Sequence, residues 1–502
     1  MTTQELPPAL LDALEESGAI GSTTRQLADQ LGRPVPALSR ELETLRESGK
    51  IERLGRGLWI LPSYSQLGAR EDFAGMDSYD ERFRSEGGVE LGRYSGPITF
   101  SPNGELPVHR WWPYVQGFSA EFVGSLLNSC SLPRGATVLD PFAGSGTTLV
   151  VARRAGYRAV GTELLPPAAL AARVKTRFEL SPVALARSGK ELLERAARRR
   201  PGKLPFLRET RQHFSPEVAG KLTQLRDALP PDHTPTVEAL RVAFGRTLIP
   251  VSRLRRSPCL GYGPETSVPG LDPFDELRKS VAEMVEDLGG LREERASWGP
   301  PATVIEADAR ELPVPAGSVD LAVTSPPYVN GMDYVMNYKL DLAWLGYARS
   351  YGDLVSLRRR LVACDNLPRD EALSNVRPED AADPWLKEIL GRIQENVRRK
   401  GSYRRNDVHG IVHRYFSDLQ PMISRVYSAL KPGGRFVLVV GDSLIAGAYV
   451  PGDLLTARAG QRAGFEVESV EVARSRRSGQ RRSFMLRESI VTLRKPGGRR
   501  AR

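Results

Sequence analysis

The feature that most constrains the fold is the alternation of short apolar segments with longer amphipathic ones, which begins near residue 101 and continues to the end of the chain. Strands and helices that alternate in this way form α/β domains, in which helices cover a mostly parallel sheet. The last two apolar segments have no helix between them, so we expect them to pair as an antiparallel hairpin. The predicted strands are residues 136–140, 158–163, 302–308, 319–327 and 435–442, followed by the hairpin strands 465–473 and 488–495.

Composition and charge narrow the kind of partner that the chain can have. The 502-residue chain has three cysteines, too few and too scattered for a disulfide framework or a zinc site, so no metal is expected. The formal net charge of +11 and the pI of about 9.6 favour a polyanionic partner, with a general solubility charge as the alternative. Arginine-rich runs lie at residues 253–258, 398–405 and 473–484. We see no membrane helix or secretory signal, and therefore expect a cytoplasmic protein.

Residues 1–62 have the pattern of a small separate domain. Three amphipathic segments precede two short strand-like segments with a glycine-rich tip, an order typical of a winged helix-turn-helix, which binds DNA or serves protein contacts and dimerisation. Residues 63–100 are polar and glycine-rich, and we interpret them as an irregular linker. The α/β domain takes up residues 101–502, with helical insertions at about 180–300 and 330–410 as candidates for substrate recognition.

A glycine-rich turn after the first predicted strand is the first chemical motif, in the sequence VLDPFAGSGTT at residues 138–148. Glycines let the backbone approach a ligand closely, and the start of the next helix offers free N–H groups. The next strand ends in Glu163, where an acidic side chain can bind the hydroxyls of a ribose. The candidate cofactor-binding residues here are Asp140, Phe142, Gly144, Ser145, Gly146, Thr147 and Glu163.

A second motif, Thr-Ser-Pro-Pro-Tyr, ends the predicted strand at residues 319–327. Together with the glycine-rich turn it resembles the paired motifs of the S-adenosylmethionine-dependent amino-methyltransferases of DNA, over roughly residues 105–180 and 300–345. The resemblance implies a Rossmann-like class I methyltransferase core, a mixed sheet with a C-terminal antiparallel hairpin, and S-adenosyl-L-methionine as cofactor. It also implies that an acidic residue contacts the adenine amine of this cofactor, and Asp308 is the matching residue.

In this family the catalytic motif corresponds to Ser325, Pro326, Pro327 and Tyr328. An exocyclic amine is a poor nucleophile because its lone pair is delocalised into the ring, and hydrogen-bond acceptors at the amine can localise that lone pair. The Ser325 side chain and the Pro326 carbonyl are the candidate acceptors, and the prolines fix the direction of that carbonyl. Tyr328 offers a face on which a base extruded from the duplex can stack.

The resemblance implies double-stranded DNA as the substrate, and the serine-type motif is associated in the family with methylation of cytosine at N4. Adenine N6 is the alternative target. The cofactor motif precedes the catalytic motif here, whereas serine-type enzymes commonly have the reverse order. An RNA amino-methyltransferase and a non-catalytic DNA-binding regulator are the rival functions. Cognate restriction or other defence proteins are candidate partners.

Overall fold

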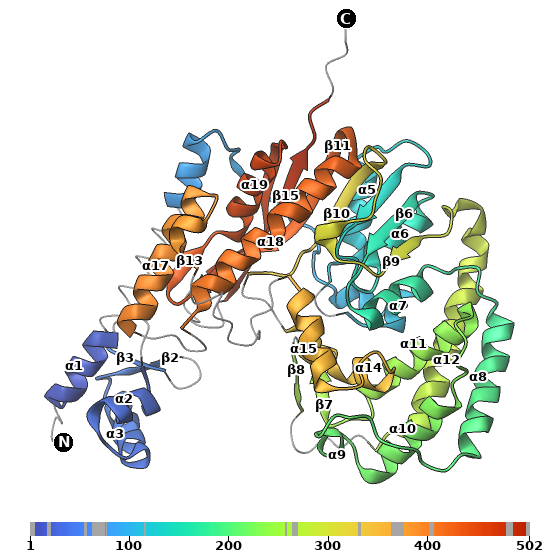
Figure 1. Ribbon diagram of the computed structural model, residues 1–502, viewed down its shortest axis with the longest axis horizontal. Coiled ribbons are helices and arrows are strands. Elements are labelled where there is room, and N and C mark those ends of the chain that lie inside the picture. The colour runs from blue at the N-terminus through green and yellow to red at the C-terminus, as the bar shows by residue number, and fades with distance from the viewer. Residues whose placement is uncertain are drawn as a thin grey trace, which may run out of the picture.

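The computed structural model shows a central sheet flanked by helices, a helical region beside it and a small N-terminal region (Figure 1). None of the described helices is both long and apolar enough to cross a membrane. The structure describes residues 6–17, 22–54, 58–62, 76, 78–114, 117–256, 259–263, 270–329, 333–362, 376–400, 406–477 and 485–497.

The central sheet has eight strands in the order β4-β14-β15-β11-β10-β5-β6-β9. The strands from β11 to β9 in this order are parallel, whereas β15 runs antiparallel to both β11 and β14. The mixed sheet with its C-terminal antiparallel hairpin, expected from the sequence, is therefore confirmed. The strands are β4 (Leu91–Arg93), β5 (Thr137–Asp140), β6 (Arg158–Thr162), β9 (Thr303–Ile305), β10 (Val319–Thr324), β11 (Leu430–Gly441), β14 (Glu466–Arg477) and β15 (Met485–Arg494).

Helices cover both faces of this sheet. Successive residues of a strand point to opposite faces, and the strands here are apolar on both, so both faces are buried under helices. On β10, Leu321 and Val323 belong to the core formed with α5 and α6, whereas Ala322 belongs to the core formed with α17, α18 and α19. The covering helices are α5 (Ala120–Ser129), α6 (Thr147–Arg154), α7 (Pro166–Lys175), α17 (Pro384–Lys400), α18 (Val408–Ala429) and α19 (Gly452–Arg462), with a short hairpin, β12 (Ser443–Ile445) and β13 (Ala448–Val450), before α19.

Part of the segment 63–100 differs from the irregular linker expected there. Leu91–Arg93 form the edge strand β4, which pairs in parallel with β14, and Tyr79 and Phe83 are buried on the sheet face covered by α17. Apolar residues are sparse in this segment, so its composition resembled that of a linker. An edge strand of a few residues, however, needs no periodic apolar pattern of its own.

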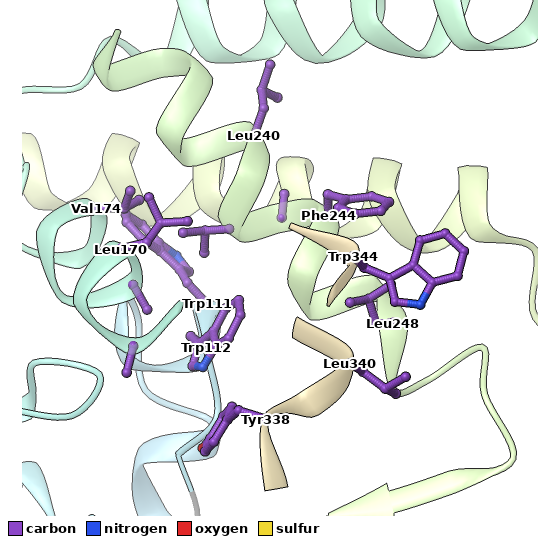
Figure 2. Packing of buried hydrophobic residues seen from close by; sticks show 14 of the residues in the cluster. Trp111, Trp112, Leu170, Val174, Leu240, Phe244, Leu248, Tyr338, Leu340 and Trp344 are labelled. Atoms are coloured by element: carbon purple, nitrogen blue, oxygen red, sulfur yellow. The ribbon is translucent and has the colours of Figure 1, made fainter. Parts of the chain in front are cut away.

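The region on the right of Figure 1 has a core of its own and contains the insertion at about 180–300, which is mostly helical as expected. Figure 2 shows this core, where Phe244 of α11 lies near Trp344 of α14 and Trp112 comes from the segment before β5. Its elements are α8 (Pro182–Ala197), α9 (Thr210–His213), α10 (Pro216–Ala228), α11 (Pro235–Leu248), β7 (Leu254–Arg256), β8 (Leu260–Tyr262), α12 (Pro273–Leu291), α13 (Tyr334–Asn337), α14 (Lys339–Trp344) and α15 (Tyr351–Arg360). Short 3₁₀ helices are η2 (Ser101–Gly104), η3 (His109–Trp111), η4 (Arg292–Ser297), η5 (Ala309–Glu311) and η6 (Pro378–Asp380).

The N-terminal region has the three helices and the strand pair that its sequence pattern predicts, with one more short strand, β1, between the first two helices. The small antiparallel sheet has the order β1-β3-β2, and Arg53, the first residue of the wing expected at residues 53–56, forms a 2.5 Å ion pair with Glu43. Residues 55–57 at the tip of the wing lie outside the described residues. The elements are α1 (Pro8–Ser17), β1 (Ser22–Thr23), α2 (Thr24–Leu31), α3 (Val35–Glu47), β2 (Glu52–Leu54) and β3 (Leu58–Ile60). A DNA-binding winged helix stays a prediction for this region.

Candidate active site and cofactor cavity

The two sequence motifs meet because the strands that precede them are neighbours. In the parallel pair β5 and β10, Leu139 lies beside Ala322, so the carboxyl ends of both strands reach the same edge of the sheet. There Thr324 Oγ1 donates a 2.6 Å hydrogen bond to Asp140 Oδ1 and accepts one from the Phe142 N–H at 3.2 Å. The glycine-rich turn and the Pro-Pro corner are thus joined directly, although 184 positions separate Asp140 from Thr324.

A cavity of about 790 Å³, counting its open mouth, lies at this edge of the sheet. Tyr114 and Phe118 are among its lining residues, as are residues 360–362 at the end of α15. Gly146, Pro326 and Tyr328, although predicted for the site, are not among the lining residues. The predicted residues that line the cavity are Asp140, Phe142, Gly144, Ser145, Thr147, Glu163, Asp308, Ser325 and Pro327.

The two glycines of the turn have left-handed backbone conformations, and a side chain at either position would be crowded by its neighbours. Gly144 has φ +51°, and a Cβ atom there would lie 3.0 Å from the ring of Tyr114. Gly146 has φ +87°, and its Cβ would lie 3.0 Å from the backbone of Ala172. At Gly144 the turn therefore presents bare backbone to the cavity, which suits a ligand that approaches the chain closely.

Asp140 ties the turn to the catalytic corner. Its Oδ2 accepts a 2.6 Å hydrogen bond from Thr148 Oγ1 at the start of α6, and its Oδ1 accepts from Thr324. Burial raises the pKa of this carboxyl to about 6, and the hydrogen bonds from the two threonines oppose the rise. These contacts fix where the turn begins relative to the end of β10.

Glu163 follows β6 and points back to the glycine-rich turn. Its Oε2 accepts a 2.8 Å hydrogen bond from the Gly144 N–H, and its Oε1 accepts one of 2.8 Å from the Leu165 N–H. Burial raises the pKa of Glu163 to about 7, against the effect of these backbone bonds. Each carboxylate oxygen has a second lone pair, so the side chain can still accept hydrogen bonds from the two hydroxyls of a ribose.

Asp308 lies on the opposite wall of the cavity, just before η5. It accepts a 2.9 Å hydrogen bond from the Arg310 N–H and forms a 2.6 Å ion pair with the guanidinium of Arg310, which also pairs with Asp418 at 2.7 Å. Burial would raise the pKa of Asp308, but the hydrogen bonds from Arg310 outweigh it and lower that pKa. Asp308 is thus an ionised acceptor, as contact with an amine would require.

Tyr328 lies on the far side of the catalytic corner, against the C-terminal hairpin. Its ring packs on Gly441, where a Cβ atom would lie only 2.8 Å from ring atom Cε2, and its hydroxyl donates to Glu488 Oε1. The guanidinium of Arg476 lies 5.9 Å from the ring centroid. Glu488 lies outside both sequence motifs and was not among the predicted site residues. The one available signal was a lone acidic residue at the start of an apolar strand.

Tyr114 links the cavity to the helical region, a role that the sequence analysis also missed. Its ring stacks on that of Tyr338, with centroids 5.5 Å apart and planes 15° apart, and the guanidinium of Arg256 lies 4.2 Å from the Tyr338 centroid. Arg256 belongs to strand β7 of the insertion and forms a 2.5 Å ion pair with Asp341. A continuous stack of side chains therefore joins the insertion to the glycine-rich turn.

One of the segments that line this cavity matches the model of a known protein family. A family model for N6/N4 methyltransferases, described as DNA methylase, matches residues 109–172. Over this segment the chain is similar to the N6/N4 DNA methylases. Its relatives include the type II methyltransferase M.BsoBI of Geobacillus stearothermophilus, 25% identical over 448 residues that cover 80% of this chain and 88% of the relative. Type II methyltransferase M.AvaI of Nostoc sp. is 23% identical over 470 residues, covering 83% of this chain and 92% of the relative.

Solved structures resemble the chain only loosely. TrmN from Thermus thermophilus is 13% identical, covers 76% of this chain and 49% of that one, and has a TM-score of 0.25. A geranyl diphosphate methyltransferase is 8% identical, with coverages of 83% and 92% and a TM-score of 0.28. The family match itself implies S-adenosylmethionine as cofactor, and the bare glycine turn flanked by the acceptors Glu163 and Asp308 fits that molecule.

Proposed function

We propose that the protein is a site-specific DNA methyltransferase that moves a methyl group from S-adenosylmethionine to the exocyclic N4 amine of a cytosine in duplex DNA. The observation that carries this proposal is the cavity in which the glycine-rich turn, Glu163 and Asp308 lie together with Ser325 of the Pro-Pro corner. The DNA methylase family match and the names of the type II methyltransferase relatives support DNA as the substrate. They also support a role beside a cognate restriction enzyme.

Each part of the site has a distinct task in this reaction. When bound, S-adenosylmethionine supplies a methyl group activated by a positively charged sulfur. Glu163 accepts hydrogen bonds from the ribose hydroxyls, and Asp308 accepts one from the adenine amine. The Ser325 Oγ and the Pro326 carbonyl accept hydrogen bonds from the cytosine amine, which directs its lone pair toward the cofactor. Tyr328 provides the surface on which the extruded base stacks, so catalysis depends mainly on positioning.

The exposed hairpin of strands β7 and β8 supports the insertion at about 180–300 as the target-recognition region. Arg253 precedes this hairpin and Arg255 lies within it, both exposed, and Tyr262 on its second strand is 61% exposed. A two-stranded ribbon fits the major groove of DNA, and arginine binds guanine and phosphate with two hydrogen bonds. Residues 257–258, 401–405 and 478–484 of the basic runs lie outside the described residues. In this proposal the N-terminal winged helix adds a second DNA contact.

The choice of cytosine N4 rests on the side chain of Ser325 and on the resemblance of its motif to serine-type enzymes. A neutral hydroxyl accepts a hydrogen bond from the amine without taking its proton. Adenine N6 is the alternative target, because the same acceptors can hold either exocyclic amine.

The deciding experiment incubates the purified protein with S-adenosylmethionine labelled in its methyl group and with unmethylated genomic DNA, and in parallel with total RNA. The nucleic acid is then digested to nucleosides, and the labelled nucleoside is identified by mass spectrometry. We expect labelled N4-methylcytosine from DNA. Labelled N6-methyladenine would overturn the choice of base, label in RNA alone would overturn the substrate, and no label with cofactor binding intact would favour a non-catalytic regulator.

A further inference from the structure

Glu488 connects the catalytic corner to the C-terminal hairpin. On β15 it pairs with Gly441 of β11 on one side and with Arg474 of β14 on the other. Its carboxylate accepts a hydrogen bond from the Tyr328 hydroxyl at Oε1 and forms an ion pair with Arg474 at Oε2. The Glu488 residue is 6% exposed, so both carboxylate oxygens are committed to these two partners inside the protein.

The ring of Tyr328 is confined by its neighbours. Gly441 has no side chain, and the ring fills the space where a Cβ atom would lie. Arg476, which lies near the ring, donates a 2.7 Å hydrogen bond to the Asp442 carbonyl. The orientation of the ring is thus set by backbone contact on β11 and by the hydrogen bond to Glu488.

The Glu488 carboxylate also determines which partner donates in its hydrogen bond with Tyr328. A carboxylate only accepts, so the Tyr328 hydroxyl must donate its proton to Glu488. Burial raises the pKa of Tyr328 well above its usual value and Glu488 adds to the rise, whereas a hydrogen bond with the Ser325 side chain opposes it.

We propose that Glu488 is a positioning residue of the methyl-transfer reaction, which acts through Tyr328 by fixing the orientation of the base-stacking ring. This inference rests on the proposed function. It assigns to the C-terminal hairpin a part in holding the target base, whereas the cofactor cavity is built from other strands.

Substitutions at Glu488 test this role against a purely structural one. Glu488→Ala removes the acceptor, whereas Glu488→Gln keeps an amide oxygen that can still accept from Tyr328. The matched control is Glu468→Ala on β14, which removes a partly exposed carboxylate that pairs with Arg435 at 2.7 Å. For each variant we would measure the dissociation constant for S-adenosylmethionine by calorimetry, kcat and KM for DNA, and the fluorescence of 2-aminopurine placed at the target position.

We expect Glu488→Ala to lower kcat about 10- to 100-fold and to reduce the 2-aminopurine signal, with cofactor affinity changed less than about twofold. Glu488→Gln should recover most of the loss, and Glu468→Ala should behave as the wild type. In a protein that already carries Tyr328→Phe, Glu488→Ala should lower kcat by less than about a further twofold, because the effects of residues that act as a unit do not add.

Two results would overturn the inference while leaving the function in place. One is an active wild type in which Glu488→Ala has no effect on kcat or 2-aminopurine fluorescence. The other is a loss of kcat in Glu488→Ala that multiplies with the loss in Tyr328→Phe, or a loss of kcat that is matched by an equal loss of cofactor affinity. A wild-type protein that binds cofactor but methylates no DNA would overturn the proposed function itself and this inference with it.

Discussion

Replacing Gly144 by alanine tests whether the glycine-rich turn has the tight geometry described. A residue other than glycine at φ +51° has a left-handed backbone, which costs about 1–2 kcal/mol. The new methyl group would lie 3.0 Å from Cε1 and 3.2 Å from Cζ of the Tyr114 ring, and such overpacking costs about 1–3 kcal/mol more. We therefore expect Gly144→Ala to lower the free energy of unfolding by about 2–5 kcal/mol.

Gly317→Ala is the matched control, because Gly317 has φ +63° but nothing within 4 Å of its Cβ position. Gly317→Ala should lower the free energy of unfolding only by the cost of the left-handed backbone, about 1–2 kcal/mol. Urea unfolding of both variants without cofactor measures the difference. Adding Tyr114→Ala to Gly144→Ala should remove the crowding, so that the double variant loses less than the sum of the two single losses. Equal losses in Gly144→Ala and Gly317→Ala, or strict additivity with Tyr114→Ala, would refute the reasoning.

Three further predictions concern charge and chemistry. Because burial raises the pKa of Glu163 to about 7, its contribution to the free energy of unfolding is present below its ordinary pKa of 4.5 and is lost as the pH rises through 7. Urea unfolding between pH 5 and 8 should therefore give a flatter profile for Glu163→Gln, and a profile parallel to the wild type would contradict the assignment. Ser325→Ala should lower methyl transfer about 100-fold while calorimetry shows unchanged cofactor affinity, and loss of cofactor binding would show that the roles are misassigned. Replacing Arg253 and Arg255 by alanine should make the slope of log affinity against log salt concentration, measured by fluorescence anisotropy, shallower by about 1 per arginine. An unchanged slope would exclude the hairpin as a DNA contact.

The sequence predicted those parts of the fold that have a local signal. The strands before Asp140 and before Ser325 are short apolar runs that end in glycine or proline, and such runs can be read along the chain. Their pairing side by side follows from the rule that ligand sites in parallel sheets form at the carboxyl ends of the strands. The positions that the structure gives to Asp308 and Glu163 in the cavity are consistent with this rule.

The parts that the sequence could not predict depend on contacts between distant segments. Glu488 reaches Tyr328 across 160 positions, and Tyr114 reaches Gly144 only because the chain before β5 folds back over the turn. The edge strand β4 pairs with β14 through three residues of a segment with few apolar side chains. Neither spacing nor composition within one segment carries such information, since register is decided by the partner strand.

The pairing of β5 with β10 has a consequence for how such a protein can change. Besides the bond between Thr324 and Asp140, Asp320 accepts a 2.8 Å hydrogen bond from the Thr137 N–H, so the two strands are fastened at both ends. The distance between the glycine-rich turn and the Pro-Pro corner is therefore set by hydrogen bonds inside the sheet. In the proposed function the long helical segment between the two strands reads the DNA sequence, so exchanging that segment would change the sequence that is read while the spacing of the two motifs stays the same.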